Sequence, residues 1–122
     1  MTRILIIDDE EMVRDMLRQT LERAGYEVLE ASEGGMGLRL FHSHKPDLII
    51  TDILMPGREG IETILELHKK APAAKIIAIS GGGRVSKQDF LPIAQSFGAV
   101  KTLAKPFERQ DLLAAVQMVL AQ

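Results

Sequence analysis

Four apolar runs in this chain each stop at a polar residue that could bind a metal ion or a phosphoryl group. The runs and the residues that follow them are Ile4–Ile7 with Asp8 and Asp9, Leu48–Thr51 with Asp52, Ile76–Ile79 with Ser80, and Val100–Ala104 with Lys105. If the runs are parallel strands of one sheet, their polar ends meet at its carboxyl edge, where open α/β sheets bind ligands. Three carboxylates, a hydroxyl and an ammonium at that edge predict a site for a divalent cation and a phosphoryl group, with Asp52 as the acceptor.

Asp8 and Asp9 are adjacent carboxylates at the end of a strand-like apolar run. Like charges this close repel each other strongly, and a hard cation removes the repulsion. Mg²⁺ suits such a site because it binds a few carboxylates together with water and substrate phosphate. Either aspartate could instead cap the helix expected from Glu10, since Asp is a favoured N-cap residue. Asp52, at the end of a second run, favours the metal site.

Asp52, Ser80 and Lys105 also have ordinary structural interpretations. Asp52 could open the Pro-Gly turn that follows it, Ser80 could be a loop or capping residue, and Lys105 could be a solvated lysine. The functional interpretation makes Asp52 a carboxylate nucleophile that becomes an acyl phosphate. Ser80 would then donate a hydrogen bond to a phosphoryl oxygen, and Lys105 would act as a fixed point charge on the phosphate.

The elements that must position these residues alternate between short apolar runs and longer amphipathic stretches, a pattern typical of β/α units. Strands are predicted at 3–7, 26–30, 47–51, 75–79 and 100–104, the second of them at an edge of the sheet. Helices are predicted at 10–24, 33–43, 60–70, 86–98 and 108–121. In the third helix, Ile61, Ile64, Leu65 and His68 share one face. Units of this length favour a parallel sheet with right-handed crossovers.

The composition limits the class of protein. The 122 residues fit one domain, and 46% hydrophobic with 26% charged residues is typical of a soluble globular protein. A net charge of −2 disfavours binding to nucleic acid or to an anionic membrane. The lack of cysteine excludes disulfides, thiolate metal sites and thiol catalysis. The apolar run after Met1 is too short for a signal peptide or a membrane span, so we expect a cytoplasmic protein.

Taken together, these motifs resemble the receiver domain of bacterial two-component response regulators over essentially the whole chain. The matching segments are Ile6-Ile7-Asp8-Asp9-Glu10, Asp52-Ile53-Leu54-Met55-Pro56-Gly57 with Gly60, Ile79-Ser80-Gly81, Gly98-Ala99 and Lys105-Pro106-Phe107. The resemblance implies a flavodoxin-like, doubly wound sheet of five parallel strands in the order 2-1-3-4-5, with five helices. It also implies that residues 1–122 form a receiver domain, with no output domain in this chain.

The resemblance gives the acidic residues separate roles. Asp52 would accept a phosphoryl group from a histidine kinase or a histidine phosphotransfer protein. Asp9 would bind Mg²⁺ directly and Asp8 through water. Asp52 and the backbone carbonyl of Leu54 would complete the protein's share of the metal ligands. The only reactions expected are self-catalysed phosphoryl transfer and autodephosphorylation, without turnover of an external substrate.

The resemblance also makes Ser80 and Lys105 the sensors of phosphorylation. Both would move towards the phosphoryl oxygens and couple the site to a face formed by the fourth helix, fifth strand and fifth helix. A downstream protein would bind that face, with no nucleic acid or membrane involved. Thr102 departs from the family pattern, which usually has an aromatic residue three positions before the lysine. Switching is therefore expected to work through the main chain and Ser80.

Three other interpretations remain open at this point. A receiver fragment of a longer regulator would have the same sequence. A phosphohydrolase with an Asp nucleophile would use the same chemistry, but such enzymes generally need an acidic residue where this chain has Leu54, and a cap for which no sequence remains. A receiver that is never phosphorylated is disfavoured by the complete set of Asp8, Asp9, Asp52, Ser80 and Lys105.

Overall fold

The computed structural model of the chain describes residues 1–52, 59–80, 101–105 and 107–122. Its elements are β1 (Arg3–Ile7), α1 (Glu11–Arg23), β2 (Glu27–Ala31), α2 (Gly34–His44), β3 (Leu48–Asp52), α3 (Glu59–Lys70), β4 (Ile76–Ser80), β5 (Lys101–Ala104) and α5 (Arg109–Leu120). Each of these elements lies within about a residue of its predicted range at either end. The predicted helix over 86–98 and the glycine loop over 81–83 lie outside the described residues.

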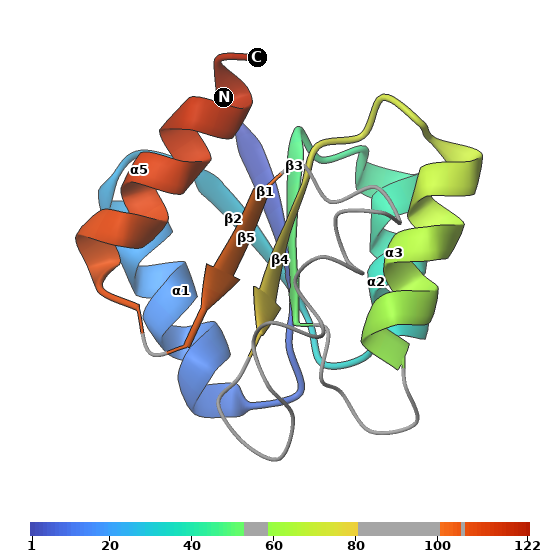
Figure 1. The fold of residues 1–122 in the computed structure, drawn as a ribbon, viewed down its shortest axis with the longest axis horizontal. Helices are drawn as coiled ribbons and strands as arrows, with labels where there is room; N and C mark the ends of the chain where they lie inside the picture. The colour runs from blue at the N-terminus through green and yellow to red at the C-terminus, as the bar shows by residue number, and fades with distance from the viewer. Residues whose placement is uncertain (53–58, 81–100, 106) are drawn as a thin grey trace.

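The five strands form one parallel sheet in the order β2-β1-β3-β4-β5 (Figure 1). This confirms the expected flavodoxin-like order, and β2 lies at an edge as predicted. In the ladders, Ile7 pairs with Thr51, the next residue Asp52 pairs with Ile79, and the carboxyl ends of β4 and β5 also pair. Strands that start and stop in register bring their polar terminal residues to one edge, the lower edge in Figure 1.

Helices cover both faces of the sheet, with α1 and α5 on one side and α2 and α3 on the other (Figure 1). All of Ile4–Ile7 is fully buried, and alternate residues face two separate cores. The even-numbered residues pack with Leu17 and Val116, and the odd-numbered ones with Ile64 and Leu67. A strand buried on both faces needs an uninterrupted apolar run, which is the pattern that β1 and β3 show in the sequence.

Helix α3 corrects one detail of the predicted inner face. Ile64 is fully buried as expected, but His68 is exposed and Leu67 is fully buried in its place. Leu67 lies three residues after Ile64 and four after Thr63, which is also buried, so these three side chains share the face that meets the sheet. The apolar side chain is the one that gains from this burial. Among the described helices, none is long and apolar enough to cross a membrane.

Gly37 lets helix α2 approach the strand that carries the first aspartates. A Cβ atom added at Gly37 would lie against Ile7 Cδ1 and 2.7 Å from Ile7 Cγ1. Ile7 is fully buried and immediately precedes Asp8, so neither the side chain nor the strand has free space to move into. A Cβ atom at Gly35, in the same helix, would meet only the side chains of Glu33 and Arg39, at 3.2 Å and 3.8 Å.

We therefore expect opposite effects from two alanine substitutions in α2. Gly37→Ala should lower the free energy of unfolding by about 1–3 kcal/mol, because overpacking outweighs the better helix propensity of alanine. Gly35→Ala is the matched control and should leave stability unchanged or raise it by up to about 1 kcal/mol. Urea unfolding followed by circular dichroism measures both changes. Equal effects at the two positions would contradict this account of the packing.

Candidate functional site

Four acidic side chains converge at the carboxyl edge of the sheet. Asp8 follows β1 and Asp52 ends β3, and these two residues are only 1% and 2% exposed. Asp9 and Glu10 continue the chain after Asp8 and are exposed. Oxygen atoms from all four carboxylates lie within 4.8 Å of one another. The structure thus brings together the three aspartates that the sequence singled out and adds Glu10 to them.

Lys105, which follows the edge strand β5, contacts this acidic cluster. Strand β5 lies two strands away from β3, and the Lys105 side chain is 15% exposed. Its Nζ lies 3.0 Å from Asp52 Oδ2, 3.3 Å from Asp8 Oδ2 and 3.2 Å from Glu10 Oε1, and the ammonium donates a hydrogen bond to each. Two of these three carboxylates are buried, so solvent and salt screen the interactions only weakly. Lys105 therefore lies in the site, and its interpretation as a solvated lysine is wrong.

Asp8 is held by hydrogen bonds to both its main chain and its side chain. Its N–H donates to the carbonyl of Ala31 at 3.0 Å, and its carbonyl accepts from Arg14 Nη1 at 2.7 Å. Its Oδ1 accepts from the N–H of Glu10 at 2.8 Å. Helix α1 has Glu10 as its N-cap and no side-chain capping bond, so neither aspartate caps it. These three hydrogen bonds fix the position of Asp8 within the acidic cluster.

The charges in the cluster are not balanced. Burial raises the pKa of Asp8 to about 6, against a hydrogen bond from the Glu10 N–H that lowers it, and the nearby charge of Asp52 raises it further. Burial disfavours the charged form of Lys105, but its hydrogen bond to Asp52 and the surrounding carboxylates hold its pKa above the ordinary value. Among the described residues, Lys105 is the one cation that forms ion pairs with these four carboxylates, and it contacts three of them. Hard oxygen donors this close together, with excess negative charge, fit Mg²⁺.

Three further positions that the sequence singled out are Ser80, Leu54 and Thr102. Ser80 ends β4 and pairs with Ala104 of β5, which brings its backbone to the same edge; only the backbone of Ser80 is described. Leu54, the predicted carbonyl ligand, lies outside the described residues. Thr102, which stands where members of the family usually have an aromatic residue, is half-buried in β5 and pairs with Ala78.

Glu10 and Arg14 contact the site, although no role was predicted for either from the sequence. Glu10 had a visible signal, because it directly follows two acidic residues at a strand end. Arg14 had none. It lies on α1, six residues after Asp8, and no spacing rule relates a helical side chain to the carbonyl of a preceding strand end. Its contact depends on how α1 packs on the sheet.

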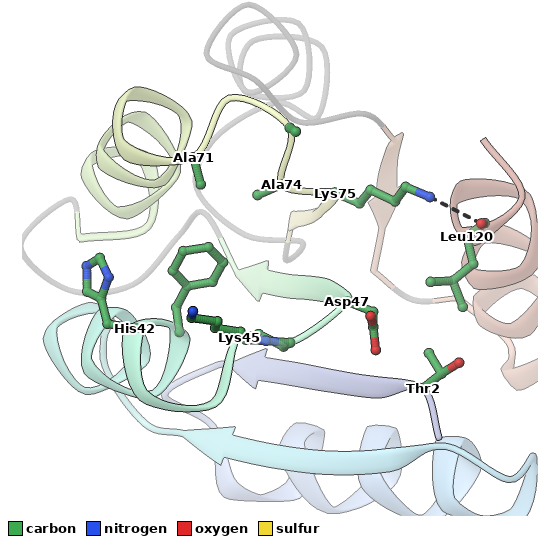
Figure 2. Close-up of a pocket in the computed structure, with 11 residues that line it drawn as sticks. Thr2, His42, Lys45, Asp47, Ala71, Ala74, Lys75 and Leu120 are labelled. Atoms are coloured by element: carbon green, nitrogen blue, oxygen red, sulfur yellow. Dashed lines mark hydrogen bonds between the residues drawn. The ribbon is translucent and has the colours of Figure 1, made fainter.

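A cavity of about 620 Å³ lies at the opposite edge of the sheet from the acidic cluster (Figure 2). Its wall includes Thr2, Asp47 and Lys75, which precede strands, together with the end of α2 and the loop after α3. Beside it, Lys75 Nζ donates hydrogen bonds to the carbonyls of Leu120 at 3.1 Å and Gln122 at 2.8 Å. This lysine ties the end of α5 to the start of β4. The length of the sheet separates this cavity from the acidic cluster, so it contributes nothing to the candidate site.

The raised pKa of Asp8 predicts how stability depends on pH when no divalent cation is present. The folded protein, with a pKa of about 6, holds this proton more tightly than the unfolded chain, whose ordinary pKa is 3.8. This contribution to stability is therefore complete below pH 3.8 and is lost as the pH rises through about 6. Asp8→Asn should remove this loss and raise the free energy of unfolding at pH 7 by on the order of 1–2 kcal/mol.

Urea unfolding in EDTA at several pH values between 4 and 7 measures this effect as the difference between variant and wild type. Asp9→Asn is the matched control, because it removes an exposed carboxylate from the same cluster. We expect that variant to keep most of the wild-type pH dependence. A difference between Asp8→Asn and wild type that stays constant over this range would show that Asp8 does not carry the effect.

The sequence is similar to a known protein family and to proteins that have been described. Residues 4–117 match the model of the response regulator receiver domain family. The transcriptional regulatory protein PdtaR of Mycobacterium tuberculosis is 35% identical over 121 residues, which are 98% of this chain and 57% of that protein. The chain thus spans a little over half the length of these curated relatives.

Solved structures resemble the fold over nearly the whole chain. A response regulator receiver domain protein from Clostridium thermocellum has a TM-score of 0.90 at 34% identity, covering 99% of this chain and 95% of that one. The chemotaxis protein CheY4 of Vibrio cholerae has a TM-score of 0.86 at 30% identity, covering 98% of both chains. The receiver domain of NtrX from Brucella abortus has a TM-score of 0.91 at 28% identity, again covering 98% of both chains.

Proposed function

This chain belongs to the response regulator receiver domain family of two-component signal transduction, and we propose that it is a phosphorylation switch with Asp52 as the phosphoryl acceptor. The contact of the Lys105 ammonium with both buried aspartates, Asp8 and Asp52, is the observation that carries the proposal. Burying these groups costs desolvation energy that a hydrophobic core would not incur. Their place at the ligand-binding edge of the sheet supports a role in handling charge.

Asp52 supplies the nucleophile in this proposal. One of its carboxylate oxygens attacks the phosphorus of a phosphohistidine, and the new O–P bond forms as the P–N bond breaks. The products are an acyl phosphate on Asp52 and an imidazole that takes up a proton. Phosphoryl transfer depends mostly on positioning and charge stabilisation. Asp52 is positioned by the end of β3, and the ammonium of Lys105 lies 3.0 Å from its Oδ2.

We assign Mg²⁺ to the carboxylates of Asp8, Asp9 and Asp52, with the carbonyl of Leu54 as a further ligand. When bound, the ion supplies positive charge that stabilises the phosphoryl oxygens. The close carboxylate oxygens and the burial of Asp8 and Asp52 support this assignment, because a bound cation stabilises the charged form of buried carboxylates. Ser80 would donate a hydrogen bond from its hydroxyl to a phosphoryl oxygen.

Lys105 links the phosphorylation state to the surface in this proposal. Once Asp52 is phosphorylated, the ammonium exchanges Asp8 and Glu10 for phosphoryl oxygens and draws the end of β5 with it. Beside β5 and α5 lies a hollow of about 370 Å³ whose lining includes Leu103 and Met118, the latter 45% exposed. We propose that a downstream protein binds this face, together with the predicted helix over 86–98. With Thr102 in β5, the signal passes through the main chain.

The proposed phosphoryl donor is a histidine kinase or a histidine phosphotransfer protein. Within residues 1–122 we propose one receiver domain, which passes its signal by protein–protein contact. Autodephosphorylation of Asp52 would be the one reaction that ends the signal.

Incubation with Mg²⁺ and acetyl phosphate tests the proposed function directly. Intact-mass measurement should show a single phosphoryl adduct that is absent without Mg²⁺ and absent in Asp52→Asn, which lacks the nucleophile. Asp47→Asn is the matched control, because Asp47 is an exposed aspartate at the opposite edge of the sheet and its loss should leave the adduct intact. An unchanged wild-type mass would rule out the switch, and phosphate release over many turnovers would favour the phosphohydrolase.

A further inference from the structure

Arg14 of α1 binds the main chain of Asp8 beside the acidic cluster, and we propose that it is a positioning residue that sets the affinity of the site for a divalent cation. Its Nη1 donates a hydrogen bond to the backbone carbonyl of Asp8 at 2.7 Å, and it contacts none of the four carboxylates of the cluster. This inference rests on the proposed function, since the cation is the one that Asp8, Asp9 and Asp52 would hold.

The carbonyl that Arg14 binds belongs to the peptide group joining Asp8 to Asp9. A peptide group is planar, so a bond to its oxygen also fixes the direction in which the chain continues to Asp9. The N–H of Asp8 is already held by Ala31, at 3.0 Å. In the part of the chain that the structure describes, no hydrogen bond or ion pair holds the exposed carboxylate of Asp9. The position of Asp9 therefore depends on this peptide group.

Arg14 is itself held in place by β2. Its Nε lies 3.6 Å from Glu30 Oε1, and the other oxygen of Glu30 lies 3.3 Å from Arg18 Nε. The Arg14 side chain is only 18% exposed. The planar guanidinium can contact Glu30 through one nitrogen and the Asp8 carbonyl through another, whereas a lysine ammonium offers a single point of contact. The edge strand and the first helix thus together set the orientation of the Asp8–Asp9 peptide.

The charge of Arg14 makes the inference testable by the sign of the effect. A positive charge near the cluster disfavours cation binding, so an effect of charge alone would make Mg²⁺ bind more tightly after Arg14→Gln. A positioning role has the opposite consequence, because the metal ligands lose their alignment. Arg14→Lys keeps the charge and loses the second contact. A positioning role therefore requires Arg14→Lys to bind Mg²⁺ more weakly than wild type as well.

Isothermal titration of the full chain with Mg²⁺ measures this affinity. Arg14→Gln should weaken binding by about tenfold to a hundredfold, the range typical of residues that orient metal ligands, and Arg14→Lys by a smaller factor. Arg18→Gln is the matched control, because Arg18 shares Glu30 with Arg14 and has no contact with Asp8. It should bind Mg²⁺ as the wild type does. Saturating Mg²⁺ should restore the rate of phosphorylation of Arg14→Gln by acetyl phosphate.

The outcomes separate this inference from the proposed function. A wild type that binds no Mg²⁺ would overturn both, whereas a wild type that binds it and a folded Arg14→Gln variant that binds it equally or more tightly would overturn the inference alone. Circular dichroism checks the fold of each variant. If Arg14→Gln does not fold, Arg14→Lys decides, and wild-type affinity in that variant overturns the inference.

Discussion

The Lys105 ammonium and the carboxylates around it are the interaction on which the rest of this structure depends. Two buried aspartates at neighbouring strand ends would repel each other, and the ammonium between them offsets part of that repulsion. Asp8 nevertheless keeps a raised pKa, chiefly because it is buried and further because of the charge of Asp52. The folded state therefore gains from any further positive charge at this edge. In the proposed function, Mg²⁺ supplies that charge. The repulsion between the carboxylates in the ion-free protein then favours binding of the ion.

The scaffold behind the charges is rigid, and that rigidity leaves the charged groups as the parts that can rearrange. Strand β1 is buried on both faces, and helix α2 approaches it closely at Gly37. Asp8, the next residue after this strand, is held by Ala31, Glu10 and Arg14. Lys105, by contrast, is bound at its ammonium by three carboxylates and has no comparable bond to the main chain among those described. A lysine can exchange such partners for phosphoryl oxygens without disturbing the core.

The two edges of the sheet use lysine in different ways. At the amino edge, Lys75 donates to main-chain oxygens of Leu120 and Gln122, and Figure 2 draws the first of these bonds. These bonds fasten the end of α5. At the carboxyl edge, Lys105 contacts ionisable side chains, those of Asp8, Glu10 and Asp52. The cavity at the amino edge is the larger of the two hollows described above, yet the charged groups at the carboxyl edge make up the candidate site.

The sequence by itself determined the strands, their polar ends and the residue types of the site. Strands buried on both faces must be apolar throughout, so Asp8, Asp52 and Lys105 stand out where the apolar runs stop. The helix over 86–98 and the roles of the site residues in metal binding and phosphoryl transfer stay predictions. The tertiary structure alone decided which atoms meet: that Lys105 also binds Glu10, that Arg14 holds the Asp8 carbonyl, and that Leu67 rather than His68 faces the sheet. The physical reason is that periodicity records local geometry, whereas contacts between elements depend on how helices pack on the sheet.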